Sequence, residues 1–189
     1  MSVPRCLRVG QRVGQPEWLV GQLDAVQLLL DLEGDRRIDV HVMHEKAFVR
    51  ACADGNLPLV RLLLSLAGDR RVDVHAQGER AFWEACRHGH TSMVRELLAL
   101  DANRYIDVHA SHEIAFRSAC SSGHLEVVRE LLGLTGDRRI DVHASDEAAL
   151  RDSCVYRGEN VMCELLALPP DRGYTWDTPQ QQNGSAQAR

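Results

Sequence analysis

Apolar positions along the chain follow two different spacings, and their alternation predicts short helices joined by turns. In residues 113–120 the apolar side chains recur every three or four residues, the period of a helix with one buried face. Gly123 is expected to end that helix, and a second amphipathic helix follows in residues 125–132. Segment 135–139 is rich in turn-forming residues, and 140–144 alternates apolar and polar positions as an extended segment does. One unit is therefore a helix, a turn, an antiparallel helix and an extended loop.

This unit repeats every 34 residues without an insertion. The shift aligns four columns: Glu45, Glu79, Glu113 and Glu147; Ala47, Ala81, Ala115 and Ala149; Cys52, Cys86, Cys120 and Cys154; and the leucine pairs that begin at Leu63, Leu97, Leu131 and Leu165. A single unit cannot bury its own apolar face, so neighbouring units are expected to stack.

The repeat divides the chain into a stack and two flanking segments. Residues 1–10 are predicted to be a flexible N-terminus, and the polar, glutamine-rich tail 169–189 to be disordered, although Tyr174 and Trp176 are candidates to dock on the last helix pair. The stack covers residues 11–168 and comprises an N-terminal cap at 11–44, repeats at 45–78, 79–112 and 113–146, and a C-terminal cap at 147–168.

Residues 119–132 resemble the core of the ankyrin repeat, Ala-Ala-x-x-Gly-His-x-x-Val-Val-x-x-Leu-Leu, and residues 85–90 match its first half. The resemblance covers residues 11–168 and implies an all-α solenoid of stacked antiparallel helix pairs joined by short extended loops. Two features depart from the family: the period is 34 where about 33 is usual, and other residues replace the Thr-Pro-Leu-His opening, as in 114–117. We therefore expect the loop that forms a hairpin in this family to be reshaped.

Composition narrows the possible functions. Of 189 residues, 44% are apolar and 26% charged, which is typical of a globular chain. No apolar run approaches the roughly 20 residues of a membrane span, and the basic start has no apolar segment behind it, so we expect neither a membrane protein nor a secretory leader. The net charge of −5 argues against nucleic-acid binding.

The cysteine column predicts buried, reduced thiols. Packed helices lie about 8–10 Å apart, whereas a disulfide needs Cα atoms within about 7 Å. Cys163 replaces an arginine of earlier units and is expected to be exposed and reactive. Free thiols indicate an intracellular protein, cytoplasmic or nuclear.

A histidine column stands two residues after an aspartate column, which places both side chains on one side of an extended segment. The pairs are Asp39 and His41, Asp73 and His75, Asp107 and His109, and Asp141 and His143. We predict hydrogen bonds between neighbouring loops. Units near 10 Å apart cannot converge on a zinc ion with bonds of about 2 Å, so no metal or other cofactor is expected. A stack whose stability depends on pH is a further hypothesis.

Positions that differ between units are the candidates for recognition. The resemblance implies that a partner docks on the concave face formed by the first helices and the loop tips. The candidate residues there are Asp54, Trp83, Arg87, His88, Arg117, Ser121, Ser122, Arg151, Val155 and Tyr156. Tryptophan, tyrosine and arginine are enriched at binding hot spots. The alternative is that these are ordinary helix surface, with Trp83 partly in the core.

Arginine pairs in the connectors form a second candidate surface. They are Arg36, Arg37, Arg70, Arg71, Arg138 and Arg139. Such an edge is suited to an anion or an acidic partner, unless the neighbouring aspartates cancel its charge.

The chain carries no phosphate loop, nucleophile elbow or zinc-protease motif, so we predict no enzyme. The leading hypothesis is a monomeric, non-catalytic module that binds another protein on its concave face. The alternatives are a structural remnant of a longer array with no retained partner, and anion or acidic-partner binding through the arginine edge.

Overall fold

The computed structural model describes residues 17–32, 36–101, 104–155 and 159–169, which form two compact units divided after Val40. The first of these compact parts of the chain contains α1 (Glu17–Leu30). The segment 11–44, predicted as one cap, is therefore divided between the two compact parts. The predictions for residues 1–10 and 170–189, including Tyr174 and Trp176, lie outside the described residues.

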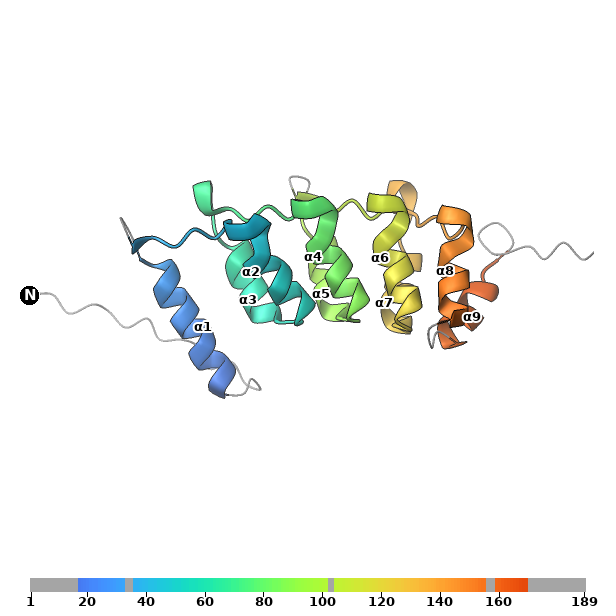
Figure 1. Cartoon of the computed structure of the whole chain (residues 1–189), viewed down its shortest axis with the longest axis horizontal. Coiled ribbons are helices and arrows are strands. Elements are labelled where there is room, and N and C mark those ends of the chain that lie inside the picture. Colours follow the sequence, from blue (N-terminus) through green and yellow to red (C-terminus); the bar gives the residue numbers. More distant parts are fainter. Residues whose placement is uncertain (1–16, 33–35, 102–103, 156–158, 170–189) are drawn as a thin grey trace, which may run out of the picture. The chain divides into compact units, whose positions relative to one another are not determined.

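The second compact part, which begins at His41, is a stack of helix pairs (Figure 1). Its elements are α2 (Val42–Ala53), α3 (Leu57–Leu64), η2 (Gly68–Arg70), α4 (Ala76–Arg87), α5 (Thr91–Leu98), α6 (Ala110–Ser121), α7 (Leu125–Leu132), η4 (Gly136–Arg138), α8 (Ala144–Val155) and α9 (Glu159–Leu166). We call α2, α4, α6 and α8 the first helices and α3, α5, α7 and α9 the second helices. Within the described ranges every regular element is a helix or a 3-10 turn.

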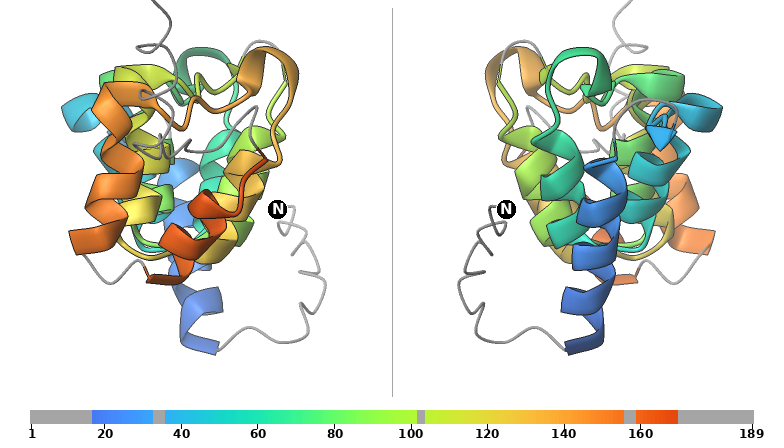
Figure 2. Two further views of the ribbon diagram at one scale, coloured as in Figure 1. Left: turned by 90° about the vertical axis from the view of Figure 1, so that its right-hand side faces the viewer. Right: turned by 90° about the vertical axis from the view of Figure 1, so that its left-hand side faces the viewer.

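The two kinds of helix form two layers, seen along the stack in Figure 2. Each first helix packs on the second helix of its own pair, and α2, α4, α6 and α8 pack successively on one another. In the other layer α5, α7 and α9 follow one another. The predicted all-α solenoid of antiparallel helix pairs is confirmed.

The repeated apolar columns form the core. Phe48, Phe82 and Phe116 are fully buried at equivalent places in successive first helices. The cysteine column lies beside them: burial raises the pKa of the Cys52 thiol to about 12, so it stays protonated near neutral pH. The prediction of a buried column fails at Cys154, which is exposed, because no described element packs on the outer side of α8.

A left-handed turn precedes the right-handed part of each first helix. In α6 the residues Ser111, His112 and Glu113 have φ of 50°, 56° and 60°. The same three positions have positive φ in α2, α4 and α8. A left-handed conformation costs about 1–2 kcal/mol per non-glycine residue, so contacts elsewhere must stabilise these turns. They account for the reshaped loop predicted above.

The glutamate column supplies those contacts. Glu45, Glu79 and Glu113 are only 3, 6 and 3% exposed. The Oε1 atom of Glu113 accepts a hydrogen bond from the backbone N–H of Asp141, in the loop that leads into α8, at 3.2 Å. Glu45 and Glu79 make the same bond to the loops that lead into α4 and α6, at 3.2 and 3.3 Å. The left-handed turns of α2, α4 and α6 thus each place a carboxylate where it holds the loop before the next first helix.

The histidine column completes this junction. The Nδ1 atom of His109 lies 2.6 Å from Glu113 Oε1, and its Nε2 atom lies 2.7 Å from the carbonyl oxygen of Asp137 in the next unit. His41 bridges Glu45 and the carbonyl of Asp69 in the same way. The predicted bonds between loops are therefore present. The aspartate two residues earlier has another role: Asp107 Oδ1 accepts the backbone N–H of His109 at 2.9 Å, because that short loop turns back on itself.

These contacts predict that the stack loses stability as the pH rises. Both partners of His109 are acceptors, so the ring donates at both nitrogens only as an imidazolium. The hydrogen bond to Glu113, then that to Asp137, raise the pKa of His109 above its ordinary 6.5. A raised pKa gives stabilisation that is complete below the unfolded-state value and lost as pH rises through the folded-state value. The ring is partly solvated, so we expect the melting temperature to fall by only about 1–3 °C between about pH 6 and about pH 8.5.

The control for this pH effect is a second histidine of the same helix. Substitution His109→Gln should reduce the slope of melting temperature against pH, whereas His112→Gln, at an exposed tip position, should leave it unchanged. Equal slopes in the wild type and His109→Gln would contradict the role of the imidazolium.

Two further sets of bonds connect the units. His124 donates from Nε2 to the carbonyl of Arg87 in the preceding unit at 2.9 Å, and His90 does the same to Ala53. Along the second helices, Arg61 binds both carboxylate oxygens of Glu96, at 2.9 and 2.7 Å. The pairs Arg95 with Glu130 and Arg129 with Glu164 continue this row.

Candidate partner-binding surface

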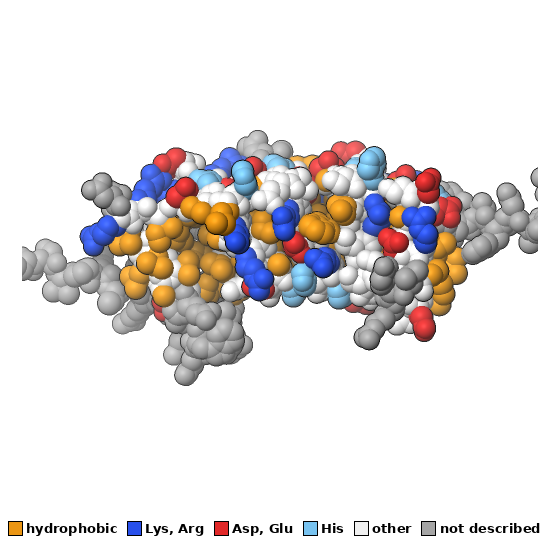
Figure 3. Space-filling view, in the orientation of Figure 1, with side chains coloured by type: hydrophobic (Ala, Val, Ile, Leu, Met, Phe, Trp, Pro, Cys, Tyr) orange, Lys and Arg blue, Asp and Glu red, His pale blue; other side chains and the backbone are white. Residues whose placement is uncertain are grey.

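The outer surface of the first helices and their left-handed tips is the candidate site, and we call it the first-helix face. Figure 3 views this face and shows Lys and Arg side chains spread across it, with apolar side chains between them. Because the helices stack in register, side chains one or two turns apart in each helix face the same way.

A hollow of about 580 Å³ opens on this face between α2 and α4. It is lined by Met43, Lys46, Val49, Arg50, Ala53 and Asp54 from α2 and its C-terminal end, and by Gln77, Arg80, Glu84, Arg87 and His88 from α4 and its C-terminal end. Three of the predicted recognition residues, Asp54, Arg87 and His88, therefore lie around one cavity.

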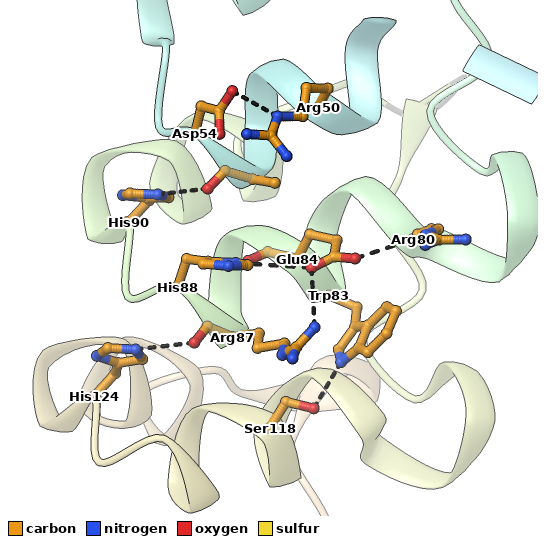
Figure 4. A network of polar contacts seen from close by, with 11 residues as sticks. Arg50, Asp54, Arg80, Trp83, Glu84, Arg87, His88, His90, Ser118 and His124 are labelled. Atoms are coloured by element: carbon orange, nitrogen blue, oxygen red, sulfur yellow. Dashed lines mark hydrogen bonds and ion pairs between the residues drawn. The ribbon is translucent and has the colours of Figure 1, made fainter. Parts of the chain in front are cut away.

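Glu84 is the centre of the polar network beside this hollow (Figure 4). It is only 8% exposed, yet its carboxylate lies 3.7 Å from Arg80, Arg87 and His88. His88 also donates from Nδ1 to the Glu84 carbonyl oxygen at 3.0 Å. One buried carboxylate thus holds two arginines and a histidine at the edge of the hollow.

Trp83 joins two units. Its Nε1–H donates to the hydroxyl of Ser118 in α6 at 2.6 Å, and its ring packs partly against the core. The guanidinium carbons of Arg80 and Arg87 lie 6.0 and 5.9 Å from the ring centroid, within the range of cation–π attraction. The ring of Trp83 therefore contributes to packing and also lies beside two arginines of the first-helix face.

The other predicted residues lie further along the same face. Arg117 is half-buried and donates to Ser145, at the start of α8, at 3.4 Å. Arg151 is exposed and donates to the carbonyl of Asp146. Ser121 bonds the carbonyl of Ser118, and Ser122 is exposed where α6 ends. The Val155 side chain and Tyr156 lie outside the described residues.

The connector arginines differ from one another. Arg138 is half-buried: it donates to the carbonyl of Leu98, at the end of α5, at 3.1 Å, and lies 4.6 Å from the Tyr105 ring centroid. Arg104 likewise bonds the carbonyl of Leu64 at the end of α3. The first arginine of these two connectors thus satisfies an unpaired helix carbonyl. Of the predicted edge, Arg70 is half-buried, whereas Arg36, Arg37, Arg71 and Arg139 are exposed.

Four charged residues of the hollow were missed by the sequence analysis: Lys46, Arg50, Arg80 and Glu84. A signal was present in the column Arg50, Glu84, Ser118 and Asp152, which varies from repeat to repeat. It lies three residues before the column that contains Arg87, Ser121 and Val155, which are predicted recognition residues. Helical periodicity puts positions 80, 84 and 87 on one face.

The described residues form neither a metal-ligand cluster nor a membrane-spanning helix. No three of their His, Cys, Asp or Glu side chains are arranged to hold a metal ion. No helix in the described ranges has both the length and the hydropathy of a membrane span.

The fold and the surface together define a repeat protein with a preformed face. A sequence model of the family described as Ankyrin repeats (3 copies) matches residues 18–112, and the chain belongs to the ankyrin repeat family. Comparisons with the curated proteins and with the solved structures gave no match. Ankyrin repeats are generally protein–protein interaction modules and are typically non-catalytic.

Proposed function

We propose that this protein is a non-catalytic module that binds a partner protein on the first-helix face. The observation that supports the proposal is the different use of repeated and variable side chains. Repeated ones, such as His109 and His124, bond one repeat to the next. Variable ones, such as Arg87 and His88, surround an open hollow.

The mechanism in this proposal is presentation of a rigid surface. Stacked helices hold the recognition side chains in place before the partner arrives, which lowers the ordering cost of binding. We propose that the protein acts as a monomer within the cell, where its free thiols suit a reducing compartment.

A capture experiment tests the proposal. Immobilised wild-type protein and the variant Arg87→Ala/His88→Ala are incubated with a lysate of the cells that naturally express the protein. Bound proteins are then quantified by mass spectrometry. A partner should be depleted at least about tenfold with this variant, the loss that about 1.4 kcal/mol of binding energy produces. The matched control, Arg71→Ala/Arg139→Ala, changes two exposed connector residues and should retain the partner.

Three outcomes would count against the first-helix face. Equal capture by all proteins would remove these residues from the interface. Loss with the connector variant alone would move the site to the arginine edge. Absence of any specific protein on the wild type would favour a structural remnant. Circular dichroism of each variant serves as the control for correct folding.

A further inference from the structure

We propose that the hollow between α2 and α4 binds an acidic segment of the partner protein through aspartate or glutamate side chains. This inference rests on the proposed function and gives it a chemistry. Four permanent cations line the hollow: Lys46, Arg50, Arg80 and Arg87. Two carboxylates accompany them, so the lining has a net charge of about two positive units, while the whole chain carries −5. A local surplus of positive charge on an acidic protein attracts an acidic partner selectively to that place.

The cations of α2 retain most of their donors. Arg50 donates from Nε to Asp54 at 2.8 Å, and its side chain is 75% exposed. That bond uses one of the five donors of a guanidinium. Lys46 contacts the sulfur of Met43 at 3.6 Å, a weak acceptor, and is also exposed. An incoming carboxylate therefore finds donors that need not give up strong bonds.

The cations of α4 are held in position by the residues beneath them. Arg80 and Arg87 each lie 3.7 Å from Glu84, beyond direct hydrogen-bond distance, and both lie beside Trp83. Arg80 also donates from Nη1 to Gln77 Oε1 at 2.8 Å, which uses one of its five donors. The positions of both arginines are thus restricted while most of their N–H groups remain available. Planar guanidinium groups bind carboxylates with two parallel hydrogen bonds, and restricting them beforehand lowers the cost of doing so.

The remaining lining favours a polypeptide over a nucleic acid. Met43 is exposed and Val49 half-buried, so the hollow offers aliphatic surface for an apolar neighbour of the acidic residues. Among the described residues that line the hollow there is no Phe, Trp or Tyr ring on which a nucleic-acid base could stack.

The test is direct binding of a defined probe. A fluorescein-labelled peptide of glutamate and serine with one leucine is titrated with the full-length protein, and fluorescence anisotropy is measured. Its counterpart has glutamine in place of every glutamate. We expect the acidic peptide to bind at least about tenfold more tightly than the glutamine peptide, with affinity falling between about 50 mM and about 200 mM salt.

Two variants with equal net charge locate the site. Lys46→Glu/Arg50→Glu should weaken binding of the acidic peptide by about tenfold or more, since it reverses two charges at the hollow. Arg71→Glu/Arg139→Glu reverses two charges on the connectors and should stay within about twofold of the wild type. The milder variant Lys46→Gln/Arg50→Gln should lose about half as much affinity for the acidic peptide, measured as the logarithm of Kd. This variant replaces the charge-reversed one in the test if the latter fails to fold.

Several results would overturn the inference. If both charge-reversed variants lost the same affinity for the acidic peptide, the binding would depend on the net charge of the protein and not on the hollow. Equal binding of the glutamine peptide would exclude carboxylate recognition. A single-stranded oligonucleotide that binds more tightly and is displaced by the same substitutions would assign the hollow to nucleic acid. If the capture experiment succeeds while the acidic peptide fails to bind, the partner-binding proposal stands and its acidic chemistry is wrong.

Discussion

Replacing Gly89 with alanine is expected to lower the free energy of unfolding by about 2–4 kcal/mol. Gly89 has φ of +75°, a region in which a side chain costs roughly 1 kcal/mol. An added Cβ would also lie 2.4 Å from Nδ1 and 2.7 Å from Cε1 of His124. The ring must move, and its bond to Arg87, worth about 1 kcal/mol, is then lost together with close packing between two units. Urea unfolding followed by circular dichroism measures the change.

The chain contains its own control for this substitution. Gly136 has a similar φ of +67°, but nothing lies within 4 Å of its added Cβ. Gly136→Ala should therefore cost only about 1 kcal/mol, the backbone part of the effect. Removing the ring should also relieve the clash, so Gly89→Ala/His124→Ala should cost less than the sum of its single substitutions. A cost for Gly89→Ala no greater than that for Gly136→Ala would show that the close approach is unimportant.

Replacing Phe116 with alanine is expected to cost about 3–5 kcal/mol, the usual range for loss of a buried phenylalanine. Its side chain is fully buried in α6, in the middle of the stack, where α4 and α8 pack on either side. Because a repeat array is stabilised by contacts between neighbours, we also expect the urea transition to broaden as the two halves of the stack unfold less cooperatively.

The matched substitution for this position is Phe116→Leu. Leucine occupies the equivalent place in α8, as Leu150, so the stack already accommodates it once. We expect Phe116→Leu to cost about 1–1.5 kcal/mol and to preserve a single sharp transition. A loss below about 1 kcal/mol for Phe116→Ala would mean that the core collapses into the cavity.

The helices and their stacking were predictable because each depends on short-range periodicity repeated at a fixed interval. Gly89 and Gly123 mark helix ends by their conformation, and Phe82 and Phe116 mark the buried side by their spacing. The left-handed turns were not predictable. Ser111 and His112 have no strong preference for positive φ, and their conformation is accompanied by a bond from Glu113 to an amide 28 residues away.

The same limit applies to the candidate site. Variation between units indicated Trp83, Arg87 and His88, because each differs from its column. It could not show that Arg50 lies across a hollow from Arg87 and His88, since that depends on how far side chains of adjacent helices reach. Nor could the alignment of the glutamate column show that Glu45, Glu79 and Glu113 are buried and bonded to the loop before the next first helix.

The constant separations of the junction bonds have a consequence for the growth of such a chain. Junctions join residues 28, 35, 37 and 40 positions apart, for glutamate to amide, arginine to glutamate, histidine to carbonyl, and arginine to helix end. A cassette of 34 residues, such as 79–112, contains the bond between Glu79 and Asp107 whole and carries one partner of each of the other three kinds of bond across each border. An in-frame duplication of one or more whole cassettes therefore restores all four kinds of bond, whereas an insertion of another length puts the partners out of register. The array can thus lengthen by whole cassettes, and each copy would bring a fresh set of surface positions to diversify.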